Sequence, residues 1–469
     1  MRTKWVAVGV AFLGVGLVQG QDLRVHRLPP ELAQKVDALA QEVLATTGVP
    51  SASVAIVQGG EIVYTQAYGE ARLDPNVAAE PRMRYSIGSI SKQFTASAIL
   101  MLEQQGKLTL DDPVSKWLPD LTDANQVTIR ELLSHTSGYQ DFWPEDYVMP
   151  PMMEPTTTQH ILDTWAKKPL DFAPGTQWQY SNTNYVIAGR IAEMANGERL
   201  LPFLEQHIFG PLHMDQVWTG DPGQLPASDA EGFERHALGP PRPAPILAKG
   251  WMFAAMELSM PAYNLAEWDI SVMNRSLLQP KSYDELEKPV LLKDGTNTHY
   301  ALGMDVRTLN GHEELEHGGE VSGFVAENIV FPQDKVAIAV LTNEDASEAA
   351  GAIGHDLAPL LLAANPATTA AETQARTLFE DFQQGKIDRS VFTPWCNAYF
   401  DQQTVEDFQT SLAPLGAPAS VTQVAEEPRG GMTFREFRVS FPNSNRVLLI
   451  TTYTEPNGKL EQYLVFPPG

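Results

Sequence analysis

Segments with the composition of β-strands occur in two blocks of this chain, and a helix-rich region separates them. The first block, SASVAIVQGGEIVYTQAYGEA, predicts two strands joined at Gly59–Gly60, because a glycine pair permits the tight turn of a hairpin. Strand-like segments return at HYALGMDVRTL, GFVAENIVFP and KVAIAVLTN, with PQDK as a turn. The intervening region is rich in proline, tryptophan and methionine and predicts helices at 128–134, 182–196 and 259–275. The fold therefore has to accommodate a helical region between strands that are distant in the sequence.

The chain divides into a large and a small predicted domain. A linker is predicted at residues 363–372, where ANPATTAAE is a run of small and turn-forming residues. Residues 30–362 form the large domain before it. Residues 373–469 predict a small α+β domain, because a helical start, TQARTLFEDFQQG, is followed by four alternating segments. With 43% hydrophobic residues, the chain can bury a sizeable core.

The N-terminus has the features of a secretory signal. MRTK carries two positive charges, the apolar run WVAVGVAFLGVGLV follows, and VQG supplies small residues for cleavage after Gly20. We therefore expect residues 1–20 to be a signal peptide, and the mature protein to be exported to the periplasm or the extracellular space without a stable membrane anchor. An uncleaved anchor is the alternative, although the run is short for a membrane span.

Charge and cysteine content narrow the range of partners. The chain has 33 Lys and Arg against 58 Asp and Glu, a formal net charge of −25, which argues against nucleic acid and anionic membranes as partners. This charge mostly favours solubility, although it can also steer cationic substrates. The single cysteine, Cys396, excludes an intrachain disulfide and is interpreted as a buried small apolar residue.

The stretch YSIGSISKQFTASAIL contains the only S-x-x-K string in the chain, Ser89 to Lys92. Residues three apart on a helix are neighbours, so the Lys92 nitrogen can reach the Ser89 oxygen. The helix that follows, FTASAILML, has no charge and is apolar on nearly all sides, which predicts burial. Burial disfavours a charged amine and lowers its pKa, so Lys92 could act as a base toward the serine hydroxyl. The alternative is a serine helix cap beside a solvated lysine, and this stretch alone does not decide between them.

Two later strings each have an ordinary structural explanation. The first is the only Y-x-N in the chain, Tyr180 to Asn182, directly before a predicted helix, where Asn182 could be a cap. The second is His317–Gly318–Gly319, at the end of a predicted strand, where the glycines could form only a turn.

The ordered set Ser-x-x-Lys, Tyr-x-Asn and basic residue-x-Gly resembles the serine hydrolases related to class C β-lactamases and penicillin-binding proteins. LLSHTSGY and ELSMPAYNLAEWD are also similar to segments of that family, and the resemblance covers residues 30–362. It implies an α+β fold, an antiparallel sheet flanked by helices with an inserted helical subdomain. It also implies a serine hydrolase that needs no cofactor and no metal.

The resemblance implies roles for the matching residues. Ser89 is the acylated nucleophile, Lys92 accepts its proton, and Tyr180 shares the proton network as base or acid. A nearby positive charge would favour Tyr180 as a phenolate, because it lowers the pKa of a tyrosine. Asn182 orients the substrate or Lys92.

The strand with the second motif is implied to bind the substrate. Gly318 and Gly319 let the substrate lie close to the backbone. The backbone N–H groups of Ser89 and Glu320 form the oxyanion hole. His317 stands where many relatives have lysine, and an imidazole is only half charged at about pH 6.5, so recognition of a substrate carboxylate is weakened or depends on pH.

The expected function is therefore a secreted serine hydrolase, of esterase or peptidase type, that acts on a small-molecule ester or amide or a peptide. A β-lactamase or D,D-peptidase proper, or a sensor of cell-wall fragments or penicillin that does not turn over, are the alternatives. A zinc enzyme is disfavoured, because the histidines of HEELEH, His312 and His317, are five apart in a strand and point to opposite faces.

Overall fold

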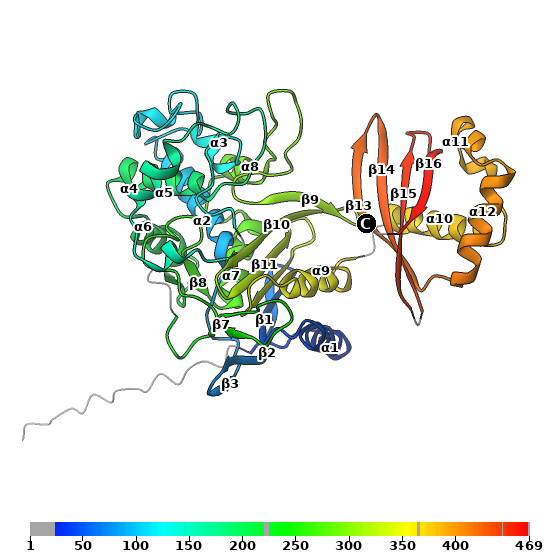
Figure 1. Ribbon diagram of the computed structural model, residues 1–469, viewed down its shortest axis with the longest axis horizontal. Coiled ribbons are helices and arrows are strands. Elements are labelled where there is room, and N and C mark those ends of the chain that lie inside the picture. Colours follow the sequence, from blue (N-terminus) through cyan, green and yellow to red (C-terminus); the bar gives the residue numbers. More distant parts are fainter. Residues whose placement is uncertain (1–23, 146, 220–224, 364–365, 443, 468–469) are drawn as a thin grey trace, which may run out of the picture.

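A computed structural model describes residues 24–145, 147–219, 225–363, 366–442 and 444–467 (Figure 1). Its main element is a seven-stranded sheet of order β3-β2-β1-β12-β11-β10-β9, in which all neighbours are antiparallel. The strands are β1 (Ser51–Gln58), β2 (Glu61–Leu73), β3 (Asn76–Ala78), β9 (Asp305–Leu309), β10 (His312–Val321), β11 (Phe324–Phe331) and β12 (Val336–Thr342).

The two predicted strand blocks meet at the centre of this sheet. The predicted hairpin at Gly59–Gly60 is present as β1 and β2. β1 then pairs with β12, for example Ala55 with Ala339, although these residues are far apart in the sequence. β12 is buried along its whole length, as its continuous apolar run VAIAVLT indicates. The expected fold class is therefore confirmed.

Helices cover both faces of the sheet. α1 (Pro30–Thr47) and α9 (Ala349–Leu361) pack on one face, where Val36, Ile338 and Ile353 belong to one apolar core. α7 (Ala262–Asn274) packs on the other face, against β1 and β12. A second, larger core fills that side and extends into the helical region.

The helical region lies between the two strand blocks in the sequence, and α2 (Ser91–Gln104) is its centre. Every residue of α2 from Ser91 to Leu102 is buried, as the uncharged run FTASAILML predicts. α2 packs against α5 (Asn182–Asn196), which in turn contacts α3 (Ile129–Leu133). The smaller helices are α4 (Thr158–Ile161), α6 (Leu200–Leu204) and α8 (Pro280–Glu287). The short strands are β4 (Tyr85–Ser86), β5 (Trp218–Thr219), β6 (Phe233–Glu234), β7 (Arg242–Pro243) and β8 (Leu258–Met260).

One predicted helix begins later than expected. The prediction covered residues 259–275, but β8 runs to Met260 and α7 begins at Ala262. Pro261 lies between them with φ −69° and ψ 155°. The residue before a proline is biased away from helical backbone, which explains why ELSM is extended and only the residues after Pro261 are helical.

The C-terminal region has its own sheet and core. Strands β13 (Ser420–Arg429), β14 (Met432–Phe441), β15 (Ser444–Thr454) and β16 (Leu460–Phe466) pair in sequence order. Helices α10 (Pro366–Gln383), α11 (Pro394–Tyr399) and α12 (Gln402–Leu412) accompany them. Phe379, Phe382 and Phe437 belong to the core of this region, which is separate from the other two. Cys396 is buried there, as expected. Figure 1 shows this region at the end of β9, which β13 contacts.

Most of the predicted linker, residues 363–372, is helical, because α10 begins at Pro366. Proline is well tolerated in the first turn of a helix, and the alanines that follow favour helix. The division into domains at this segment stays a prediction.

The predicted signal peptide, residues 1–20, lies outside the described residues. Within the described part of the chain, none of the helices has the length and hydropathy required to cross a bilayer.

Candidate active site

Ser89 lies in a short 3₁₀ turn, Gly88–Ile90, which leads directly into α2. Lys92 is in the first turn of that helix, and its Nζ donates a hydrogen bond to Ser89 Oγ at 2.9 Å. This is the neighbour relation that the three-residue spacing predicts. The structure thus brings the hydroxyl and the amine into direct contact.

The Lys92 amine is enclosed by polar groups and aromatic rings. Its Nζ donates to Asn182 Oδ1 at 2.8 Å and to the Ala255 carbonyl at 3.1 Å. It also lies 4.8 Å from the centre of the Tyr180 ring. Lys92 has no exposed surface, and this burial lowers its pKa to about 7, although Asp141 opposes the shift. A large share of the amine is therefore unprotonated near neutral pH and able to accept a proton.

Asp141 holds Asn182 in place and was missed by the sequence analysis. Its carboxylate accepts hydrogen bonds from Asn182 N at 2.9 Å and from Asn182 Nδ2 at 3.2 Å. The Asn182 amide is thereby oriented with its oxygen toward Lys92. Burial raises the pKa of Asp141, and Asn182 and Lys92 oppose this shift. A single aspartate in a loop has no spacing that could have identified it.

Tyr180 differs from the expectation in its protonation. The Ser89 side chain lies close enough to the Tyr180 hydroxyl to lower its pKa, which is consistent with the expected proton network. Burial, however, raises the pKa of Tyr180 well above its usual value, and Asp141 and Asp305 raise it further. The expected phenolate is therefore wrong, because desolvation and the carboxylates of Asp141 and Asp305 favour the neutral phenol. Tyr180 is a neutral phenol that can donate and relay a proton.

His135, in the LLSHTSGY segment, packs against the Tyr180 ring. The two rings are 4.3 Å apart between centroids. The Ser181 N–H donates to His135 Nδ1 at 3.2 Å, so the histidine also fixes the backbone beside Tyr180. Burial keeps the pKa of His135 well below its usual value, so the ring is neutral. The similarity of the LLSHTSGY segment to the family implied no role for His135.

His317 is not the partly charged substrate ligand that was expected. It is only 4% exposed, and burial lowers its pKa to about 4. Its Nδ1 contacts the Gly318 carbonyl at 2.5 Å and therefore carries the proton, so Nε2 accepts from the Tyr300 hydroxyl at 2.9 Å. The ring thus orders Tyr300 from within the protein, because both of its nitrogens already have protein partners.

Two glycines allow the Ser89 turn to lie directly against β10. A Cβ on Gly319 would be 2.0 Å from the Ile87 carbonyl oxygen. Gly88 has φ +50°, and a Cβ there would be 2.6 Å from the Glu320 nitrogen. A Cβ on Gly318, by contrast, would meet nothing closer than 3.9 Å, so of the two adjacent glycines in β10 only Gly319 makes a close approach. The backbone nitrogens of Ser89 and Glu320 are thus brought to the same edge of the site.

A substitution at Gly319 should therefore disrupt the site. We expect Gly319→Ala to push β10 away from the Ser89 turn and to lower kcat/KM by about 10²–10³-fold, the usual cost of losing one oxyanion-hole donor. Steady-state kinetics with a chromogenic ester measures this effect. Gly318→Ala is the matched control and should stay near wild type, and a fully active Gly319→Ala enzyme would show that the close approach is not required.

The cavity over Ser89 has a volume of about 320 Å³ and an acidic lining. Its carboxylates are Asp141, Glu145, Glu320 and Asp345. Its apolar wall consists of Trp143, Pro144, Tyr147, Val148, Met256 and Val321. No lysine, arginine or histidine belongs to the described residues that line it, so His317 is absent from its surface.

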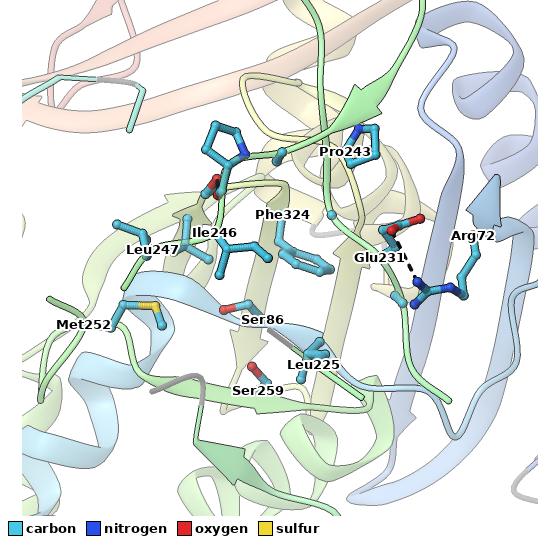
Figure 2. Close-up of a pocket in the computed structure, with 16 residues that line it drawn as sticks. Arg72, Ser86, Leu225, Glu231, Pro243, Ile246, Leu247, Met252, Ser259 and Phe324 are labelled. Atoms are coloured by element: carbon cyan, nitrogen blue, oxygen red, sulfur yellow. Dashed lines mark hydrogen bonds and ion pairs between the residues drawn. The ribbon is translucent and has the colours of Figure 1, made fainter. Parts of the chain in front are cut away.

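A second cavity of about 150 Å³ lies beyond Val321 and Ser322, which line both spaces (Figure 2). Ser86 and Ser259 are paired positions of β4 and β8, and their buried hydroxyls have no hydrogen-bond partner. Figure 2 shows both serines below the Phe324 ring, with apolar side chains around them. The lining also contains the ion pair of Arg72 and Glu231, so this second space has both apolar and polar walls.

Comparisons with known proteins agree with this geometry. The family described as Beta-lactamase matches residues 36–362. Protein flp of Staphylococcus aureus is 27% identical over 332 residues, which are 68% of this chain and 64% of that protein. The chain thus spans slightly less than two thirds of this curated relative.

Solved structures show the same fold. A D-stereospecific amidohydrolase from Streptomyces sp. is 25% identical with a TM-score of 0.60, and the match covers 69% of this chain and 97% of that one. An octameric penicillin-binding protein homologue from Pyrococcus abyssi is 19% identical with a TM-score of 0.62, covering 92% and 99%. The family match, which spans most of the chain and all the residues around Ser89, shows that this protein belongs to the beta-lactamase family.

Proposed function

We propose that this protein is an exported serine hydrolase that cleaves amides or esters through an acyl-enzyme on Ser89. The observation that carries the proposal is the 2.9 Å contact between Ser89 Oγ and a fully buried Lys92 whose pKa is lowered to about 7. A serine hydroxyl is a weak nucleophile until an adjacent base accepts its proton, and Lys92 supplies that base.

The reaction proceeds in two balanced steps. Lys92 takes the Ser89 proton as Oγ attacks the substrate carbonyl, and the oxyanion is held by the backbone N–H groups of Ser89 and Glu320. Tyr180 relays a proton to the leaving amine or alcohol, whose bond to the acyl carbon breaks and leaves an ester on Ser89. Water then attacks this ester with the same groups in reverse roles. Each oxyanion donor is typically worth about 3–4 kcal/mol.

The acidic lining of the cavity points to the substrate class. Four acidic residues line the cavity that contains Ser89, and the basic residue of the third motif, His317, is buried against Tyr300. A substrate carboxylate, as in a β-lactam or a D,D-peptide, would be repelled there, whereas an amine would be attracted. We therefore favour an amide or ester whose acyl part carries a free amine. The similarity to a D-stereospecific amidohydrolase supports an amide as the substrate.

The activity should depend on pH through Lys92. Its folded-state pKa is about 7, and only the free amine can accept the Ser89 proton, so kcat/KM should rise from acidic pH to a plateau above pH 7. Tyr180 should add no alkaline limb below its own raised pKa. A pH profile that is flat between pH 5 and 9 would exclude a lysine base.

A substrate panel tests the proposed specificity. Purified protein is assayed with D- and L-phenylalanine amide, p-nitrophenyl butyrate and a chromogenic cephalosporin, whose carboxylate serves as the contrast. We expect turnover of an amine-bearing amide or of the neutral ester, with the cephalosporin much slower. Faster turnover of the cephalosporin would overturn the amine preference, and no turnover together with a long-lived adduct would indicate a sensor.

A further inference from the structure

Three glutamates lie between β10, β11 and α9, on the sheet face that α9 covers. Glu314 and Glu316 alternate along β10 with Leu315 and His317, so they point away from the Ser89 side. In β11, Glu327 pairs with Gly318 and therefore points to the same face as Glu316. Glu314, Glu316 and Glu327 are 4%, 7% and 8% exposed. Buried carboxylates in this number require compensation by cations or hydrogen bonds.

His355 of α9 reaches these carboxylates in an orientation suited to metal binding. Its Nδ1 donates to the Gly351 carbonyl of its own helix at 2.9 Å, and its Nε2 is 3.3 Å from Glu316 Oε1. A histidine that ligates a metal typically gives its other N–H to a carbonyl or carboxylate in this way. Ligand atoms of Glu314, Glu316 and His355 all lie within 4.8 Å of one another, so one ion can contact all three.

Three carboxylate oxygens in this cluster are buried without a hydrogen-bond partner, Glu314 Oε1, Glu316 Oε2 and Glu327 Oε1, of which Glu316 Oε2 has an ion pair with Arg307. Such orphaned atoms are rare in native proteins and often indicate an ion or a water. The Glu327 carboxylate also has open space beside it, because Cβ atoms on Gly351 and Gly318 would lie 3.4 Å and 3.9 Å from its Oε2. Glu327 thus borders the cluster, although only Glu314, Glu316 and His355 have ligand atoms within 4.8 Å of one another.

The hydrogen bond with Glu316 raises the pKa of His355 to about 9, so an ion would have to displace the proton on its Nε2. A second cation, Arg307, also borders the cluster. Arg307 Nη1 is 3.1 Å from Glu316 Oε2, but this side chain is 53% exposed and lies at the solvent edge. It pairs with Oε2, whereas the oxygen near His355 is Oε1. Arg307 therefore leaves the interior of the cluster open. His355 is 40% exposed, which gives an ion a path from solvent.

We propose that Glu314, Glu316 and His355, with Glu327 close by, bind a divalent transition-metal ion of the Zn²⁺ class that ties α9 to β10. An imidazole nitrogen together with carboxylate oxygens is a donor set for Zn²⁺ and similar ions, whereas Mg²⁺ and Ca²⁺ favour oxygen ligands alone. The HEELEH segment contributes its glutamates and not its histidines: His312 contacts Asp334 and Ala363, and His317 contacts Tyr300. The ion is structural, because Ser89 and Lys92 work on the other face of the sheet.

Metal titration of the full chain tests this site. Protein dialysed against EDTA is titrated with Zn²⁺ by calorimetry, and bound metal is measured after gel filtration. We expect about one ion per chain with a Kd below about 1 µM, and a higher melting temperature in Zn²⁺ than in Mg²⁺. Glu314→Gln and His355→Gln should weaken binding by about 10–100-fold or more. His236→Gln removes an exposed histidine beside Glu234 and is the matched control.

The outcomes are distinguishable even if a variant fails to fold. X-ray absorption of the Zn²⁺-loaded wild-type protein should show one imidazole and otherwise oxygen ligands. Absence of saturable Zn²⁺ binding, a histidine-free spectrum, or a folded His355→Gln variant that binds as well as wild type would overturn the proposal. Labelling of Ser89 by a fluorophosphonate should survive EDTA, so a failed metal site and a failed hydrolase give different results.

Discussion

Replacing Ser89 by alanine is expected to reduce kcat/KM by at least about 10³-fold, since loss of a nucleophile leaves only binding and the oxyanion hole. The substitution removes one oxygen from a half-buried position, so we expect the fold to be retained. Steady-state kinetics with the preferred substrate of the panel, together with a thermal melt, measures the two effects separately.

Ser322 offers a matched control for this variant. It also lines the cavity, but its hydroxyl donates to the Pro245 carbonyl. Ser322→Ala should therefore remain within a few-fold of wild-type activity. If Ser89→Ala turned over substrate at the wild-type rate, the nucleophile would have to be a different residue.

Replacing Lys92 by methionine is expected to lower kcat/KM by about 10²–10⁴-fold, the usual contribution of a general base. Methionine has a similar length but no proton acceptor, so Ser89 is no longer activated. The acid limb near pH 7 should disappear from the residual activity, because the group that titrates there is gone. Lys116→Met, at a lysine that is half exposed and pairs with Asp112, is the control and should leave the rate unchanged.

The Lys92→Met substitution also changes how the free energy of unfolding depends on pH. The pKa of Lys92 is about 7 when folded and near 10.5 when unfolded, so the unfolded state binds more protons between these values. The free energy of unfolding contributed by Lys92 therefore falls as pH is lowered from 10.5 to 7 and is constant below. Denaturant melts of the wild-type protein at several pH values should show the unfolding free energy rising between pH 7 and 10.5. In the Lys92→Met variant the part of this rise that comes from Lys92 should be absent. An unchanged slope and an unchanged rate would show that Lys92 is an ordinary solvated lysine.

The local parts of the site could be predicted because they depend on local spacing. Three residues along a helix bring Lys92 to Ser89, and an uncharged helix behind it accounts for the burial of the amine. The hairpin at Gly59–Gly60 depended in the same way on turn chemistry. Each of these features is determined within a few consecutive residues.

The parts of the site that could not be predicted from the sequence depend on contacts between segments that are distant in the chain. Asp141 reaches Asn182 across 41 positions, and nothing in the sequence near either residue indicates that pair. The same holds for His317, whose pKa is lowered by burial and by the charge of Lys92, which is distant in the sequence. Tyr180 was expected as a phenolate because desolvation could not be judged before the packing was known. The glutamate cluster beneath α9 likewise forms only when β10, β11 and α9 meet.

Mass spectrometry after reaction with a fluorophosphonate tests the central claim, that Ser89 is the nucleophile activated by Lys92, most directly. Intact mass and peptide mapping should find one adduct per chain, on Ser89, in the wild-type protein and none in Ser89→Ala. The labelling rate should fall as pH is lowered through about 7, where Lys92 gains its proton. An adduct on another residue, or equal labelling of Ser89→Ala, would contradict this account.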